Sequence, residues 1–177
     1  MSELLLLLGG ARSGKSALAV QIASASETSV IFIATAEALD DDMRVRIERH
    51  RAERPKWTTI EEPFDLAQAL AECPPSTLVI IDCLTLWTSN LMLRGDSESV
   101  IGSHSTSALA AIAKRSAQTI AISNEVGLGI VPENQMAREY RDVLGRTNQQ
   151  WARAATKTLF MVAGKAFELK EPQEILQ

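Results

Sequence analysis

The chain has 177 residues, enough for one domain that buries a core of its own. Hydrophobic residues make up 46% of it and charged residues 23%, as is ordinary for a soluble globular protein. The net charge of -4 argues against nucleic acid as the main partner, because a phosphate backbone requires a basic protein surface. We therefore expect residues 1–177 to form a single domain that does not bind nucleic acid.

The chain carries no pattern typical of secretion or membrane insertion. The apolar run 4–8 is too short to span a bilayer and no positively charged region precedes it. The two cysteines, Cys73 and Cys83, give neither a disulfide framework nor a metal-binding spacing. We expect a cytoplasmic protein with no membrane span.

Short apolar runs alternate with helical patterns along the whole chain. Strands buried on both faces are aliphatic or β-branched at nearly every position, and this predicts strands at 4–8, 30–34, 57–61, 78–82, 119–123 and 158–162. Helices are expected near 16–25, 39–53, 64–72, 84–93, 104–117 and 134–156, and a surface loop at 94–99. Such alternation predicts an α/β fold with a mostly parallel sheet and right-handed crossovers.

The most informative motif follows the first strand, where the sequence matches G-x-x-x-x-G-K-[ST]. Between a strand and a helix this pattern is a P-loop, whose backbone N–H groups surround a polyphosphate. Its lysine reaches the β- and γ-phosphates and its final hydroxyl binds Mg²⁺. The alternative, a glycine-rich turn, does not explain the lysine-serine pair. The motif comprises Gly9, Gly10, Ala11, Arg12, Ser13, Gly14, Lys15 and Ser16.

The helix predicted at 39–53 contains one of the two histidines of the chain. Met43, Ile47 and His50 are spaced so that His50 shares the apolar side of this helix, and several arginines surround it. One interpretation is a histidine at the edge of the core among solvated charges. The other is a nucleophilic or phosphate-contacting histidine, since arginines suit a polyphosphate and would keep the imidazole neutral.

Polar residues end two of the predicted strands. Asp82 follows four apolar residues, as a Walker B carboxylate does at the ligand-binding edge of an α/β sheet. It could bind the metal, cap the helix beginning near Leu84, or do both. Asn124 and Glu125 follow the strand at 119–123. The next segment, 126–134, is rich in glycine and apolar residues, so it packs against a ligand or a neighbouring subunit, or is a packed connector.

Taken together, the motifs resemble the bifunctional adenosylcobinamide kinase / adenosylcobinamide-phosphate guanylyltransferase family. The resemblance extends through almost the whole chain. It rests on residues 9–16, 33–37, 39–43, 46–50, 54–55, 57–63, 82, 124–134 and 145–149. The blocks Asn-Glu-Val-Gly and Gly-Gly-Ala-Arg-Ser-Gly-Lys-Ser are more specific than a bare P-loop motif.

The resemblance implies two reactions. The family phosphorylates the aminopropanol hydroxyl of adenosylcobinamide with a nucleoside triphosphate. It then transfers GMP from GTP to that phosphate through a histidine-bound GMP, and the matching histidine is His50. Some members have two adjacent histidines, but the first is Arg49 here. The resemblance also implies a RecA-like P-loop NTPase fold, a homotrimer, ATP or GTP as nucleotide, and Mg²⁺.

By the same match, catalysis would fall to His50 and Lys15, and the metal to Ser16 and Asp82, although some members have Glu at the position of Asp82. The nucleotide site would be lined by the P-loop and by Thr35, Ala36, Glu37, Arg51, Ala52, Glu53, Arg54, Glu61 and Asp82. The loop 126–131 and the helix near Trp87 are candidate surfaces for the corrinoid.

Other functions fit less of the sequence. A small-molecule kinase without guanylyl transfer would use the same P-loop and Asp82, and only His50 and the family blocks argue against it. A GTP-binding switch protein requires Asn-Lys-x-Asp, which the chain lacks; its D-x-x-G spacing at 142–145 lies in a helical pattern. An ATP-dependent recombinase-like assembly protein is disfavoured by the acidic charge.

Overall fold

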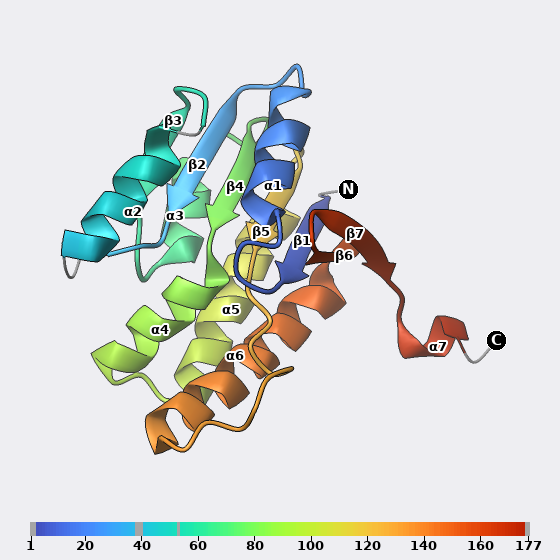
Figure 1. Cartoon of the computed structure of the whole chain (residues 1–177). Coiled ribbons are helices and arrows are strands. Elements are labelled where there is room, and N and C mark those ends of the chain that lie inside the picture. Colours follow the sequence, from blue (N-terminus) through green and yellow to red (C-terminus); the bar gives the residue numbers. More distant parts are fainter. Residues whose placement is uncertain (1–2, 38–40, 53, 176–177) are drawn as a thin grey trace.

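A computed structural model describes residues 3–37, 41–52 and 54–175. One seven-stranded sheet forms the centre of the molecule, in the order β3-β2-β4-β5-β1-β6-β7 (Figure 1). The strands are β1 Leu4–Gly9, β2 Val30–Ala34, β3 Thr58–Glu61, β4 Leu78–Asp82, β5 Thr119–Ile122, β6 Lys157–Val162 and β7 Lys165–Leu169. The helices are α1 Lys15–Ser24, α2 Asp41–Ala52, α3 Leu66–Glu72, α4 Leu84–Arg94, α5 Glu98–Ala113, α6 Gln135–Ala154 and α7 Pro172–Ile175.

The predicted α/β class is confirmed, because all neighbouring strands pair in parallel except β6 and β7. The antiparallel strand β7 was not predicted. Its sequence, Lys-Ala-Phe-Glu-Leu, is neither a continuous apolar run nor a strict alternation of polar and apolar residues. In the structure all five residues are exposed, and the strand pairs only with β6. The short helix α7 also went unpredicted.

The prediction for α5 was wrong at its start, which lies at Glu98 rather than near 104. The Ser97 hydroxyl accepts a hydrogen bond from the Val100 N–H, and Glu98 lies in the first turn, where a negative charge favours the helix dipole. The surface loop expected at 94–99 is therefore reduced to residues 95–97. The serines in this stretch suggested a loop, but Ser97 caps the helix and Ser99 lies within it.

Strand β5 separates the P-loop strand β1 from β4, the strand that ends in Asp82. Ile122 is in register with Leu7 on one side and with Asp82 on the other. Asp82 is in turn in register with Ala34 of β2. Because these strands run in parallel, the segments following them meet at one edge of the sheet, where ligands bind in open α/β folds.

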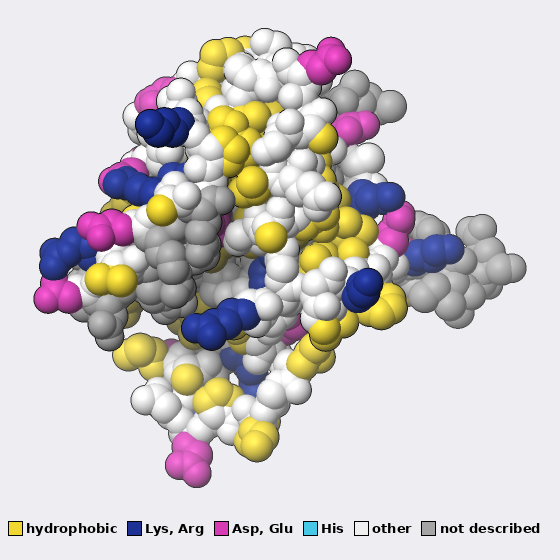
Figure 2. Space-filling view, turned by 45° about the horizontal axis from the view of Figure 1, so that its top comes forward, with side chains coloured by type: hydrophobic (Ala, Val, Ile, Leu, Met, Phe, Trp, Pro, Cys, Tyr) yellow, Lys and Arg dark blue, Asp and Glu magenta, His cyan; other side chains and the backbone are white. Residues whose placement is uncertain are grey.

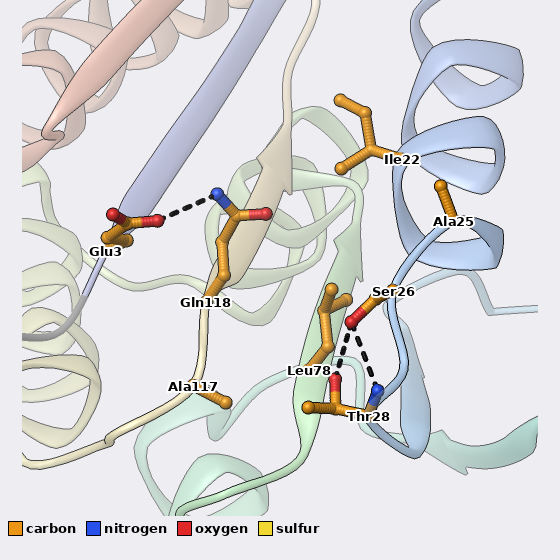
Figure 3. A pocket seen from close by; sticks show the side chains of 8 residues that line it. All are labelled: Glu3, Ile22, Ala25, Ser26, Thr28, Leu78, Ala117 and Gln118. Atoms are coloured by element: carbon orange, nitrogen blue, oxygen red, sulfur yellow. Dashed lines mark hydrogen bonds between the residues drawn. The ribbon is translucent and has the colours of Figure 1, made fainter.

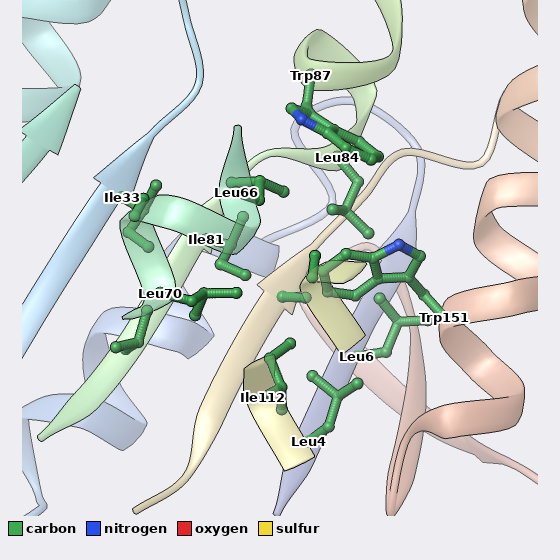
Figure 4. Packing of buried hydrophobic residues seen from close by; sticks show 14 of the residues in the cluster. Leu4, Leu6, Ile33, Leu66, Leu70, Ile81, Leu84, Trp87, Ile112 and Trp151 are labelled. Carbon is green, nitrogen blue, oxygen red and sulfur yellow. The ribbon is translucent and has the colours of Figure 1, made fainter. Parts of the chain in front are cut away.

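The two faces of the sheet bury separate apolar layers. In β1, Leu4, Leu6 and Leu8 pack with α3, α4, α5 and α6, whereas Leu5 and Leu7 pack with α1. Figure 4 shows part of the larger layer, in which Trp87 and Trp151 meet edge to face with ring centroids 6.5 Å apart. Trp87 is fully buried and its indole N–H donates to the Phe64 carbonyl, 2.8 Å away. The Trp87 side chain therefore belongs to the core, and a corrinoid-binding surface on the helix near it stays a prediction.

The P-loop is braced by the hairpin between β6 and β7. Gly9 has a φ of 144°, and a Cβ at this position would overlap the carbonyl oxygen of Met161 on β6. Gly14 has a φ of 102°, and a Cβ at this position would lie 3.3 Å from the Cα of Gly164 in the hairpin turn. The Gly164 N–H donates to the Ser13 carbonyl at 3.0 Å. Both motif glycines are thus required by the backbone geometry as well as by space for phosphate.

A buried arginine ties the α3–β4 connection to α5. Arg115 is 5% exposed, and its guanidinium donates to four backbone carbonyls at 2.6–3.3 Å. Burial lowers the pKa of Arg115, and the nearby Cys73 opposes that shift. The carbonyls belong to Leu70, Cys73, Pro74 and Thr77. Because these carbonyls are buried, the arginine serves the fold.

We expect Gly9→Ala to lower the free energy of unfolding by about 3 kcal/mol or more. The alanine Cβ would be held at a positive φ and would overlap a backbone carbonyl oxygen. Gly10→Ala is the matched control, because a Cβ on Gly10 meets nothing within 4 Å and no strained φ is involved. Its free energy of unfolding should stay within about 0.5 kcal/mol of wild type. Urea unfolding without nucleotide measures both, and equal stabilities would contradict the close approach.

Arg115→Met is expected to lower the free energy of unfolding by about 3–5 kcal/mol, because it leaves buried carbonyls without donors. Arg153→Met removes the same charge from an exposed position near the end of α6 and should change stability by less than about 0.5 kcal/mol. Urea unfolding monitored by tryptophan fluorescence compares the two. Similar losses in both variants would show that charge, rather than carbonyl pairing, is responsible.

Candidate nucleotide-binding site

The P-loop lysine is buried and bonded to its own loop. Lys15 is 6% exposed, and its Nζ donates to the carbonyls of Gly9 at 2.9 Å and Gly10 at 2.7 Å. The Ser13 hydroxyl is a third partner at 3.3 Å. Burial lowers the pKa of Lys15, whereas the nearby Cys83 and Asp82 raise it. A polyphosphate would supply the anionic charge that this desolvated ammonium lacks.

The ends of β2 and β4 are tied together by Thr35, a predicted nucleotide-site residue. Its N–H donates to the Asp82 carbonyl at 3.1 Å. Its hydroxyl donates to the Cys83 carbonyl and accepts from the Cys83 N–H, both at 2.8 Å. The buried amide of Asn90 on α4 donates to the Thr35 carbonyl at 2.7 Å. With its side chain fully buried, Thr35 fixes the backbone from which Asp82 projects.

Asp82 lies within electrostatic range of two cations predicted for the same site. It raises the pKa of Lys15 and of Arg54, although burial is the larger influence on each and lowers both values. The N-cap position of α4 is occupied by Cys83, whose side chain makes no cap hydrogen bond. Asp82 therefore lies one residue before the N-cap position of this helix.

Arg54 approaches the site from beyond α2. Its guanidinium lies over the Phe32 ring of β2, 3.7 Å from the centroid, and donates to the Thr59 hydroxyl of β3 at 3.0 Å. Cation–π contact and a hydrogen bond hold the charge beside the sheet edge. Arg51 forms an ion pair with Glu61 at the end of β3, and both side chains are about half exposed.

The remaining predicted residues are distributed around this edge. Ala36 and Glu37 follow β2 and are half-buried, whereas Ala11 and Arg12 are exposed at the tip of the P-loop. Ser16 is half-buried in the first turn of α1, and Ala52 is exposed at the end of α2. Figure 2 shows that this surface is hollowed, with basic side chains bordering the hollow.

The predicted helix bearing His50 is present as α2. The His50 side chain lies outside the described part of the structure, as does Glu53, so the orientation of the imidazole stays a prediction. Ile47 is half-buried on this helix, while Val45 is 63% exposed. The other nucleophile near the site is unsuited to the reaction, because burial and the adjacent Asp82 raise the pKa of the Cys83 thiol to about 11.

The segment after β5 does not pack against the rest of the chain as a connector would. Leu128 is 80% exposed, Ile130 97% and Val131 59%. The sequence interpretation as a packed connector is therefore wrong. The composition of this segment instead leaves apolar side chains exposed beside the nucleotide edge.

A separate hollow of about 260 Å³ lies at the opposite edge of the sheet (Figure 3). It is lined by Glu3, Ile22, Ala25, Ser26, Thr28, Leu78, Ala117 and Gln118. Its polar contacts are internal, such as the hydrogen bond from the Gln118 amide to the Glu3 carboxylate at 3.3 Å. It lies near the starts of β4 and β5, away from the P-loop.

Within the described ranges, no cluster of three His, Cys, Asp or Glu side chains could hold a metal ion. None of the described helices is both long and apolar enough to cross a membrane.

Sequence reasoning missed several side chains that shape this edge. Asn90 and Thr85 on α4, Ser123 after β5, and Asn148 on α6 are each at most 7% exposed and hydrogen-bonded to partners far away in the chain. Asn148 lies in one of the family blocks, but its neighbours in the sequence did not indicate which groups its side chain would contact. The hairpin glycine Gly164 likewise carried no sequence signal.

Solved structures share the fold at low sequence identity. An ATPase of the type III secretion system of pathogenic bacteria superposes with a TM-score of 0.54 and 12% identity, over 90% of this chain and 52% of that chain. The RadB recombinase superposes with a TM-score of 0.52 and 17% identity, over 90% of this chain and 74% of the other. They show that this chain shares their fold, whereas the P-loop itself is identified by its sequence motif.

Sequence comparison is more specific. The bifunctional adenosylcobalamin biosynthesis protein CobP of Pseudomonas aeruginosa is 42% identical over 93% of this chain and 96% of its own. The corresponding CobU proteins of Escherichia coli and Salmonella typhimurium are 38% and 35% identical, each over 94% of this chain and 99% of theirs. The family model for cobinamide kinase / cobinamide phosphate guanyltransferase matches residues 5–169. With a nucleotide edge built on this fold and matches along almost its full length, the chain belongs to the cobinamide kinase / cobinamide phosphate guanyltransferase family.

Proposed function

We propose that this protein phosphorylates the aminopropanol hydroxyl of adenosylcobinamide with a nucleoside triphosphate and then transfers GMP from GTP to the new phosphate. The final products are adenosylcobinamide-GDP and pyrophosphate. One observation carries the proposal: in a member of this enzyme family, the strand that leads to the buried P-loop lysine Lys15 and the strand that ends in Asp82 are separated by a single parallel strand.

In the kinase reaction, P-loop N–H groups hold the β- and γ-phosphates, and Lys15 exchanges its carbonyl partners for phosphate oxygens. The substrate hydroxyl attacks the γ-phosphorus, and the nucleoside diphosphate leaves. Lys15 and Arg54 neutralise negative charge that spreads over the transferring group. The exchange costs little, because it replaces neutral acceptors of the ammonium by anionic ones.

In the guanylyl transfer, the neutral imidazole of His50 attacks the α-phosphorus of GTP. A P–N bond forms and the P–O bond to pyrophosphate breaks, so the enzyme carries GMP on His50. A phosphate oxygen of adenosylcobinamide phosphate then attacks the same phosphorus, and the P–N bond breaks to restore the imidazole. Two easier displacements replace one difficult transfer.

The proposed nucleotide site consists of the P-loop with residues from the ends of β2, β3, β4 and α2. Ser16 and Asp82 would hold Mg²⁺ together with the phosphates, and Mg²⁺ supplies charge neutralisation there. The nucleotide is ATP or GTP in the kinase reaction and GTP in the second. Other proposed lining residues are Thr35, Ala36, Glu37, Arg51, Ala52, Glu53, Arg54 and Glu61.

The proposal includes assembly as a homotrimer and a cytoplasmic location. The exposed apolar side chains at Leu128, Ile130 and Val131 offer surface for a large substrate or a neighbouring subunit. Nucleoside triphosphate substrates and the two free cysteines fit the cytoplasm. Sedimentation at several protein concentrations tests the trimer.

Incubation with GTP labelled at the α-phosphate, followed by denaturation, should leave label on the protein. The label should survive base and be lost in acid, because a phosphoramidate bond is stable in base and labile in acid. His50→Ala should abolish the label. His104→Ala, which removes the only other histidine, should label like wild type. Full labelling of His50→Ala would refute the assignment, whereas active but unlabelled wild type would favour a kinase without guanylyl transfer.

Asp82→Asn is expected to raise the Mg²⁺ concentration required for half-maximal labelling by about 10- to 100-fold, because it removes a negative charge from the metal site. EDTA should abolish labelling of wild type. Asp142→Asn is the control, since this aspartate is exposed on α6 and belongs to the D-x-x-G spacing of the switch-protein alternative. An unchanged Mg²⁺ requirement in Asp82→Asn would exclude Asp82 from the metal site.

A further inference from the structure

Glu125 reaches the nucleotide edge between the P-loop and Asp82. It follows β5, the strand that lies between β1 and β4. Its N–H donates to the Gly9 carbonyl at 3.2 Å, and the same carbonyl accepts from Lys15 Nζ at 2.9 Å. One carbonyl oxygen therefore connects the backbone of Glu125 to the lysine expected to meet the γ-phosphate.

The backbone just before Glu125 is held on both sides by buried side chains. The Asn124 N–H donates to the Thr85 hydroxyl of α4 at 2.7 Å, and the Asn124 carbonyl accepts from the Asn148 amide of α6 at 3.0 Å. The Ser123 hydroxyl donates to the other end of that amide at 2.7 Å. Because these bonds come from separate helices, the segment has one defined path past the P-loop.

The Glu125 carboxylate is also oriented. Its Oε1 accepts from the Gly127 N–H at 2.6 Å, and a Cβ on Gly127 would lie only 2.8 Å from that oxygen. The side chain is half-buried, and its second oxygen has no part in this hydrogen bond. The carboxylate is therefore restrained by a hydrogen bond from an uncharged N–H group of its own turn.

Glu61 and Glu62, which also lie near this edge, are less suited to take a proton from the substrate hydroxyl. Glu61 is paired with Arg51, and Glu62 accepts the N–H groups of Phe64 and Asp65, each at 2.8 Å. Both lie at or just after β3, the outermost strand, whereas Glu125 follows the strand next to β1.

We propose that Glu125 is the general base of the kinase reaction, an inference that rests on the proposed function. The Glu125 carboxylate takes the proton of the substrate hydroxyl as that oxygen forms its bond to the γ-phosphorus. The bond between the γ-phosphorus and the bridging oxygen breaks, and the nucleoside diphosphate leaves with its electron pair. The proton then passes from Glu125 to water. Guanylyl transfer to His50 needs no such base, because a neutral imidazole attacks without losing a proton first.

The segment beyond Glu125 offers a surface from which the substrate could approach the carboxylate. The exposed side chains of Leu128, Ile130 and Val131 begin three residues after the carboxylate. A bulky amphipathic acceptor lying against this segment would bring its hydroxyl to Glu125 while the nucleotide lies along the P-loop.

The test separates the two reactions in one protein. Glu125→Gln should lower kcat for phosphorylation of adenosylcobinamide by about 10²- to 10⁴-fold, the usual contribution of a general base. Labelling by GTP labelled at the α-phosphate should stay within about threefold of wild type, and so should the Kd for a non-hydrolysable triphosphate. Glu133→Gln makes the same charge change at an exposed position of the same loop and should leave both reactions unchanged.

Each other outcome is decisive. Full kinase activity in Glu125→Gln would overturn the assignment of the base and leave the proposed function intact. Equal loss of both reactions would show that Glu125 maintains the P-loop, and would also overturn the assignment. A wild-type protein that is guanylylated but does not phosphorylate adenosylcobinamide would refute the kinase half of the proposed function together with the base.

Discussion

The nucleotide edge depends on the close approach of Gly9 to β6. The absence of a side chain lets the P-loop turn against the Met161 carbonyl, at a φ that other residues rarely adopt. The Gly9 carbonyl then accepts from Lys15 Nζ and from the Glu125 N–H. One backbone residue thereby couples β1, the end of β5 and the P-loop lysine, so a displacement at Gly9 would shift all three.

The strand order decides which chemical groups can meet. With β5 inserted between β1 and β4, the P-loop and Asp82 are separated by one strand, and the residues that follow β5 enter the space between them. Thr35 fixes the path of the chain beyond Asp82, and Asn148 fixes the path beyond Ser123. The carboxyl edge is therefore formed by several hydrogen-bonded backbone ends, which gives the polar side chains defined starting points.

The two proposed reactions would draw on different sides of this edge. Arg54, Arg51 and Glu61 lie toward β2 and β3, where α2 carries His50. Glu125 and the exposed apolar segment lie toward β5. Phosphates held along the P-loop would be shared by both sides, so one nucleotide site could present its γ-phosphorus to a hydroxyl and its α-phosphorus to an imidazole.

Sequence alone determined the features that are written locally. The P-loop lies in eight consecutive residues, Asp82 follows an apolar run, and the strand–helix alternation predicts the parallel sheet. The tertiary structure decided the rest: β7 is exposed at every position, Trp87 is core, and Thr35 and Asn148 bond to partners 48 and 24 residues away. A local pattern reports periodicity and turn chemistry. It carries no information about which distant carbonyl or amide a buried polar side chain will meet, because strand order brings those groups together.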